Sequence, residues 1–158
     1  MGVEPLSAEL IERYLDSRGL RFYRSRDGKG LLVLFSTRHG KLQVNLRASG
    51  VRSDVLVISV SSSTYSRVAD RSRLMALVND WNRDTYWPKA FVRETSQPGL
   101  IAVVGESAFP LGDGIGIAAL GNFINSSIRS GAKLFDKVAQ ATSVPSVRTL
   151  EEWLDRTG

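Results

Sequence analysis

Two aspartates one helical turn apart are the residues whose type and spacing come closest to a catalytic pair. Asp80 and Asp84 stand at positions i and i+4 of a segment with helical periodicity, so their carboxylates share one helix face. Such a pair could act as general acid and base or hold a divalent cation. Arg73 and Arg83 stand close by in the sequence, and these cations favour ordinary ion pairs. We therefore expect a charged helix surface here.

The histidine and cysteine content excludes several other kinds of chemistry. His39 is the only histidine, so a histidine-based metal cluster is excluded and a Ser-His-Asp triad would have to use this residue. It stands in a Thr-Arg-His-Gly stretch that is typical of an exposed turn. The sequence has no cysteine, which excludes disulfides, thiolate catalysis and cysteine-ligated zinc or iron–sulfur sites.

Two further motifs match known sites only by spelling. The segment GIGIAA, residues 114–119, fits the glycine pattern of dinucleotide-binding loops, but a parallel βαβ unit should surround it and no strand is expected after the helix that follows. Ser130 and Lys133 spell S-x-x-K in the middle of that helix, without the companion motifs of the enzymes that use it. The sequence thus predicts no enzyme, no cofactor and no metal site.

The elements that must position these residues follow from periodicity and turn residues. A first helix begins after the N-cap Ser7 and ends at Gly19. A second begins at Asp70, and a third covers 116–139 with one apolar stripe. Alternating or continuous apolar patterns predict strands in LRFYRS, LLVLF, KLQVNLRA, VLVISV, PKAFVRE and LIAVVGE. Gly121 and Gly131 lie inside the third helix, where glycine is unfavourable, so another backbone should come close there.

This order, α-β-β-β-β-α-β-β-α, predicts an α+β fold. Short connections favour an antiparallel sheet, built from a meander and a hairpin, with its helices packed mainly on one face. At 158 residues the length favours one such domain.

The stretch from Leu77 to Val92 concentrates asparagine and tryptophan and could be an active site, a binding surface or a hinge. Trp81 falls on the apolar stripe of the second helix, which predicts a core position. Asn82 stands where the period ends, and asparagine suits the left-handed conformation that closes helices. Pro88 forces the preceding residue into an extended shape. We interpret the stretch as structural. The residues to which we assign a structural role are Asn79, Trp81, Asn82, Trp87 and Pro88.

The net charge of +5 is concentrated in one segment. Residues 18–52 hold nine basic side chains and one acidic side chain. This excess is typical of a solvated sheet face, but it could also bind an acidic protein or the phosphates of a nucleic acid. The candidate partner-binding residues in it are Arg21, Arg24, Lys41 and Arg47.

The chain resembles the YbjN family in IERYLDSRGLRF, in LVNDWNRDTYWPKAFVR with the LIAVVGES strand after it, and in the long last helix. The similarity covers roughly residues 7–140. It implies a type III secretion chaperone-like fold and a bacterial, non-enzymatic, often dimeric, protein-binding or regulatory module. The family supplies no catalytic residues. We take residues 1–140 as this domain and keep a nucleic-acid-binding regulator as the alternative.

We expect residues 141–158 to form a linker and a short C-terminal amphipathic helix. Leu150, Trp153 and Leu154 share one face in helical spacing, and a helix this short is not stable alone. These candidate partner-binding residues could dock on their own domain, on the second subunit of a homodimer or on another protein. We find no signal peptide and no membrane-spanning run, so we expect a cytoplasmic protein.

Overall fold

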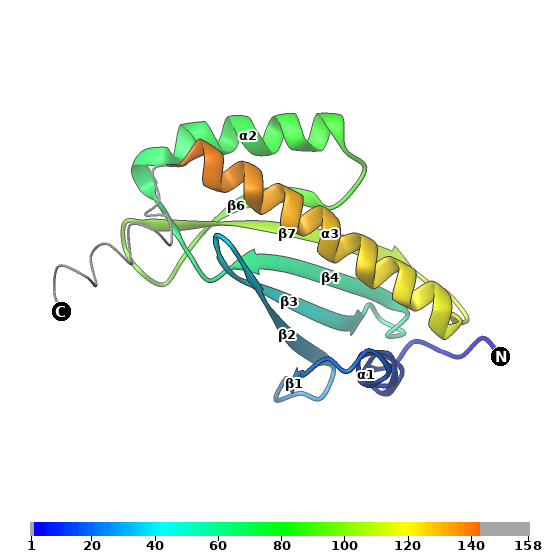
Figure 1. Cartoon of the computed structure of the whole chain (residues 1–158). Helices are drawn as coiled ribbons and strands as arrows, with labels where there is room; N and C mark the ends of the chain where they lie inside the picture. Colours follow the sequence, from blue (N-terminus) through cyan, green and yellow to red (C-terminus); the bar gives the residue numbers. More distant parts are fainter. Residues whose placement is uncertain (1, 143–158) are drawn as a thin grey trace, which may run out of the picture.

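The computed structural model describes residues 2–142, which form one antiparallel sheet with three α-helices. Figure 1 shows the elements in chain order, and a 3₁₀ turn, Val68–Asp70, leads into the second helix. The elements are α1 (Ala8–Ser17), β1 (Tyr23–Arg24), β2 (Gly30–Thr37), β3 (Gly40–Ser49), β4 (Val55–Ser62), β5 (Ser66–Arg67), α2 (Arg71–Asp84), β6 (Lys89–Glu94), β7 (Leu100–Pro110) and α3 (Ile117–Ala141).

The strands form a meander that is closed by the last hairpin. Their order is β1-β2-β3-β4-β7, with β6 and the two-residue β5 also paired to β7. In β3 and β4, Leu46 lies opposite Ile58 and Val44 opposite Val60. These apolar residues alternate with Asn45 and Ser59, which face the other side of the sheet. The predicted α+β fold and element order are confirmed, with β5 as an additional short strand.

The helices cover one face of this sheet. α3 crosses β4 and β7, while α1 packs against β2, β3 and the N-terminal half of α3 (Figure 1). Tyr14 of α1 donates its hydroxyl hydrogen to Asn125 Oδ1 of α3 at 3.0 Å. The core between helices and sheet contains the fully buried Leu10, Ile11, Leu15, Leu46, Leu56, Ile58, Leu74, Ile101, Leu120, Ile124 and Leu134. In the described part of the chain, nothing forms a layer on the opposite face.

α2 lies at the β6 edge of the sheet rather than over its middle. Its apolar stripe buries Leu74, Val78 and Trp81, and it contacts both β6 and α3. The helix runs on to Asp84, and its C-cap Thr85 has extended backbone angles. The prediction that Asn82 closes the helix in a left-handed conformation was therefore wrong.

The prediction that another backbone comes close to Gly121 and Gly131 of α3 was wrong, because the groups beside these glycines are side chains. A Cβ on Gly131 would lie 2.8 Å from a methyl carbon of Val60, and one on Gly121 would lie 2.6 Å from the Tyr14 ring. Glycine at these positions lets α3 approach the sheet and α1 closely.

Candidate protein-interaction surfaces

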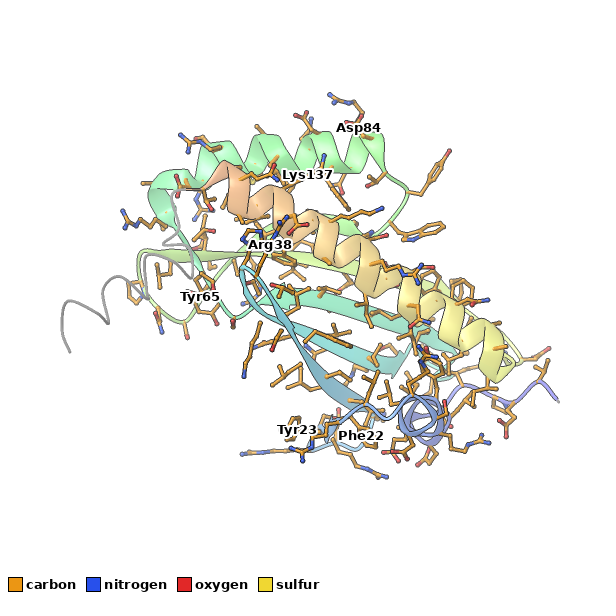
Figure 2. All side chains as sticks on the ribbon, in the orientation of Figure 1. Phe22, Tyr23, Arg38, Tyr65, Asp84 and Lys137 are labelled. Carbon is orange, nitrogen blue, oxygen red and sulfur yellow. The ribbon has the colours of Figure 1, made fainter. Side chains whose placement is uncertain are left out.

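The face of the sheet away from the helices is the first candidate surface, and we call it the open face. Side chains at alternate positions of β2 and β3 point to it, and they mix apolar groups with polar and basic groups. Tyr23 is 57% exposed and Leu34 is 40% exposed. A cleft of about 430 Å³ on this face is lined by residues that include Tyr23, Arg24, Leu32, Asn45, Arg47 and Ser59. Figure 2 shows Tyr23 beside Phe22, at the end of the molecule opposite α2.

The structure brings two of the four predicted basic residues together. Arg24 and Arg47 both line the cleft, and each is held by a carboxylate. Arg24 Nη2 lies 2.5 Å from Glu12 Oε2, and the Arg47 guanidinium pairs with Asp27. Lys41 is exposed near the other end of β3, and Arg21 is exposed in the segment before β1.

Asp27 is the anion that holds the Arg47 side chain at the cleft. Its Oδ1 accepts hydrogen bonds from Ser25 Oγ at 2.6 Å and from the Lys29 backbone N–H at 3.0 Å. The Ser25 hydroxyl, the Lys29 amide and Arg47, in that order, hold the pKa of Asp27 well below its usual range. This carboxylate is therefore ionised at neutral pH, and Arg47 keeps a fixed counter-charge.

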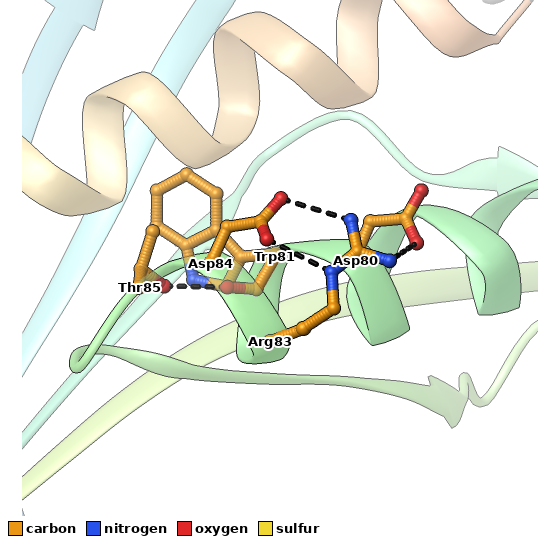
Figure 3. A network of polar contacts seen from close by, with 5 residues as sticks. All are labelled: Asp80, Trp81, Arg83, Asp84 and Thr85. Atoms are coloured by element: carbon orange, nitrogen blue, oxygen red, sulfur yellow. Dashed lines mark hydrogen bonds and ion pairs between the residues drawn. The ribbon is translucent and has the colours of Figure 1, made fainter.

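The aspartate pair on α2 forms an ion-pair cluster with an arginine. Arg83 lies between the two carboxylates, with Nη1 3.2 Å from Asp80 Oδ1 and Nε 2.9 Å from Asp84 Oδ1 (Figure 3). The hydrogen bond from Arg83 and the charges of Arg83 and Lys137 lower the pKa of Asp84. The same pairing raises the pKa of Arg83. Both carboxylates are thus engaged by Arg83.

A groove of about 450 Å³ separates the β2–β3 turn from the C-terminal half of α3. His39 Nε2 lies 3.2 Å from Asp136 Oδ1 across this groove. His39 is thus half-buried, which differs from the exposed turn residue predicted. Among the hydrogen bonds of residues 2–142, none joins a serine or threonine hydroxyl to the His39 ring. Asp136 was missed by the sequence reasoning because nothing local marks a partner nearly a hundred residues away.

The asparagine and tryptophan stretch forms a rigid corner between α2 and β6. The indole N–H of Trp81 donates to the Pro88 carbonyl at 2.8 Å, and Trp81 lies in the core. The Asn82 side chain bonds both backbone groups of Ala90. Asn79 is exposed. Trp87 is 46% exposed and Tyr86 is 98% exposed, so this corner also presents two aromatic side chains to solvent.

Leu150, Trp153 and Leu154 lie outside the residues that the structure describes. Within the described part, no group of three potential metal-ligating side chains occurs. None of the helices in residues 2–142 has the length and apolar character needed to cross a bilayer.

The fold defines a small α+β protein with its helices on one side of an antiparallel sheet. A family model for YbjN, described as "Putative bacterial sensory transduction regulator", matches residues 7–140. The chain belongs to the YbjN family.

Two solved structures share the fold. The crystal structure of YbjN from E. coli superimposes with a TM-score of 0.71 at 13% sequence identity, over 90% of this chain and 99% of that chain. An uncharacterized protein from Methanothermobacter thermautotrophicus gives a TM-score of 0.53 at 13% identity, over 87% of this chain and 100% of its own. A search of curated proteins finds no match.

Proposed function

We propose that this protein is a non-enzymatic regulatory module that binds another protein through the open face of its sheet. The observation that carries the proposal is the open face itself, where Tyr23 and Leu34 stay exposed beside a cleft. Large exposed aromatic and aliphatic side chains beside polar groups are characteristic of protein-binding surfaces. A chaperone-like action would use the same face to hold an extended segment of a partner.

The charge around the cleft selects an acidic partner. Arg24 and Arg47 already have carboxylate partners. These ion pairs hold the two guanidinium groups in place and neutralise most of their positive charge. Arg21, Arg26 and Lys29 are exposed around them and supply an excess of positive charge. Such an arrangement steers an acidic surface towards the cleft without requiring a deeply buried ion pair.

The outer edge of β2 supports the predicted homodimer. β1 pairs only with Leu31 and Leu32 of β2, and no described strand pairs with the outer edge of β2 from Leu34 onward. Since the Gly30 carbonyl bonds outward to Ser25, the alternation of an antiparallel strand directs the backbone groups of Leu34 and Ser36 outward as well. Two copies could join these edges around a twofold axis.

A nucleic-acid-binding regulator is the second candidate. The E. coli relative is described as "a putative transcription regulator", and the basic segment would meet phosphates. The ion pairs of Arg24 and Arg47 reduce the charge that is available for this role. In addition, Tyr23 is the one exposed aromatic side chain that strands β1 to β4 place on the open face. RNA-binding sheets use two or three stacking aromatic side chains.

The deciding experiment compares partner capture with oligonucleotide binding. Intact protein, a Tyr23→Ser/Leu34→Ser variant and the control Met75→Ala, which changes an exposed apolar residue on α2, are used to purify partners from a bacterial lysate. We expect a protein that is retained by the control and lost with the open-face variant. Titration of labelled DNA and RNA at several salt concentrations should give only the weak affinity of non-specific binding, in the ~100 μM range. Tight binding that falls linearly on a log–log salt plot, and that is lost on changing Arg21, would contradict the proposal.

A further inference from the structure

A second surface lies on the helix side of the molecule, away from the open face. A cavity of about 590 Å³ lies between the α2–β6 loop and the C-terminal half of α3, and we call it the lysine–aromatic cavity. Its lining includes Tyr86, Trp87, Ser130, Lys133, Lys137 and Gln140.

The aromatic side of this cavity is held rigidly. The loop that carries Tyr86 and Trp87 is fixed at both ends, because Thr85 bonds the Trp81 carbonyl through its N–H at 2.9 Å and its hydroxyl at 2.7 Å. At the other end, the Pro88 carbonyl accepts the Trp81 indole hydrogen at 2.8 Å. A fixed loop loses little conformational freedom when a ligand binds. Rigidly presented tryptophan and tyrosine are the side chains that most often anchor an interface.

The opposite wall is positively charged. Lys133 and Lys137 stand one turn apart on α3, and Lys137 Nζ lies 6.0 Å from the centre of the Trp81 ring. Figure 2 shows Lys137 between α3 and α2. Asp136 also lines the cavity, but its Oδ1 is engaged by His39 at 3.2 Å. The cavity therefore suits a segment that combines apolar side chains with carboxylates.

The chain contains such a segment. In the sequence, residues 150–155 read LEEWLD, which places three acidic residues among two leucines and a tryptophan. Gln140, at the end of the cavity, is two residues from Thr142, the last residue described. The nine residues from Thr142 to Glu151 can span about 30 Å when extended, whereas Ser130 and Gln140 are separated by about 15 Å along a helix. The tether is long enough to reach the whole cavity.

We propose that the lysine–aromatic cavity is a binding site for acidic peptides with aromatic or aliphatic anchors, and that residues 150–155 of the same chain occupy it. Trp153 and the two leucines pack against Tyr86 and Trp87, and the carboxylates of Glu151, Glu152 and Asp155 face Lys133 and Lys137. A tethered segment acts at millimolar effective concentration. A partner peptide of the same chemistry would therefore compete with it for the cavity. The proposal concerns a different face from the proposed function, and either can fail alone.

Fluorine NMR on the intact chain tests the docking. The sequence has three tryptophans, so labelling with 5-fluorotryptophan gives three signals that Trp→Phe variants assign. A Leu150→Ser/Leu154→Ser variant should move the signals of Trp87 and Trp153 towards solvent-exposed values. The signal of Trp81, which also lines the cavity but is 5% exposed, should move less. Glu151→Lys/Glu152→Lys should have the same effect, and combining it with Lys133→Glu should restore docking. Arg129→Glu, one turn earlier on α3, is the charge control and should restore nothing. Unchanged Trp87 signals in the first variant, or equal rescue by Arg129→Glu, would overturn the proposal.

A peptide titration tests the site independently. The probe is a labelled peptide of residues 146–158, added to a full-length chain carrying Leu150→Ser/Trp153→Ser/Leu154→Ser. We expect saturable binding that weakens by about thirtyfold with Trp87→Ala and is unchanged by Met75→Ala. Binding that is indifferent to Trp87→Ala would reject the cavity as the site. Mixing labelled and unlabelled full-length chains tests whether the segment docks on its own chain. Docking that strengthens with protein concentration would place the segment on a second copy and overturn the intramolecular arrangement.

Discussion

Asn82 on α2 uses its side-chain amide to bond both backbone groups of Ala90 on β6. The Ala90 N–H donates to Asn82 Oδ1 at 2.9 Å, and Asn82 Nδ2 donates to the Ala90 carbonyl at 3.1 Å. The side chain thus replaces a neighbouring strand for one residue of the sheet edge and ties α2 to that edge. It also keeps this position of β6 from pairing with another chain.

The first prediction separates Asn82 from Asn79, which stands on the same helix. Asn82→Ala should lower the free energy of unfolding by about 1–3 kcal/mol, because it leaves two backbone groups of Ala90 without partners. Asn79→Ala, at an exposed position, should change it by less than about 0.5 kcal/mol. Urea unfolding followed by circular dichroism measures both. Equal losses in the two variants would mean that the Ala90 contacts do not stabilise the fold.

The second prediction concerns Trp81, which is 5% exposed and lies in the core. Trp81→Ala should cost about 3–5 kcal/mol, as other truncations of buried tryptophan do. Circular dichroism in urea gives the value without relying on tryptophan fluorescence. A loss below about 1 kcal/mol would show that Trp81 is not a core residue.

These contacts mark the boundary of what the sequence could predict. The apolar stripe of α3 and the alternation in β3 were readable because burial repeats with the period of one element. Asn82 was assigned to a helix end since its local context fits a cap, yet its partner is eight residues away on a strand. The contact of His39 with Asp136 and the hydrogen bond of Tyr14 with Asn125 join residues that are distant in the chain, and no local pattern encodes such pairs. The exposure of Tyr86 and Trp87 was also not predictable, because it depends on how the loop between α2 and β6 is held in the fold.

The third prediction tests the close approach of α3 to β4. Gly131→Ala would gain helix propensity of about 1 kcal/mol, but the new Cβ would lie 2.8 Å from a Val60 methyl carbon. Overpacking of this kind typically costs about 1–3 kcal/mol, so we expect net destabilisation. Gly131→Ala should therefore cost less in a Val60→Ala background than in the unmodified protein, because Val60→Ala removes the methyl carbons that the new Cβ would meet. A thermodynamic cycle from urea unfolding checks this, and strict additivity of the two changes would contradict it.

The fourth prediction is a pH dependence that arises from Asp27. Its pKa is lower in the folded chain than in the unfolded chain, where aspartate titrates near about 3.9. The ionised carboxylate therefore stabilises the fold above about pH 4, and this contribution is lost as the pH falls towards the lowered pKa. Asp27→Asn should show a shallower decline of the urea midpoint between about pH 5 and pH 2. Ser25→Ala should be intermediate, because the Ser25 hydroxyl is the largest cause of the shift. Parallel pH profiles for Asp27→Asn and the unmodified protein would exclude this origin.

The last prediction concerns the outer edge of β2 and the proposed homodimer. Light scattering on the intact chain at tens of micromolar should give the mass of a dimer. Ser36→Pro should convert it to a monomer, because proline removes an N–H that points away from β3 and towards the second copy. The fold should survive this change, since Ser36 is exposed and an edge strand tolerates proline where its N–H faces solvent. Ser36→Ala keeps the N–H and should remain dimeric. A dimer in both variants would move the interface away from this edge, and a monomeric intact chain would reject the dimer altogether.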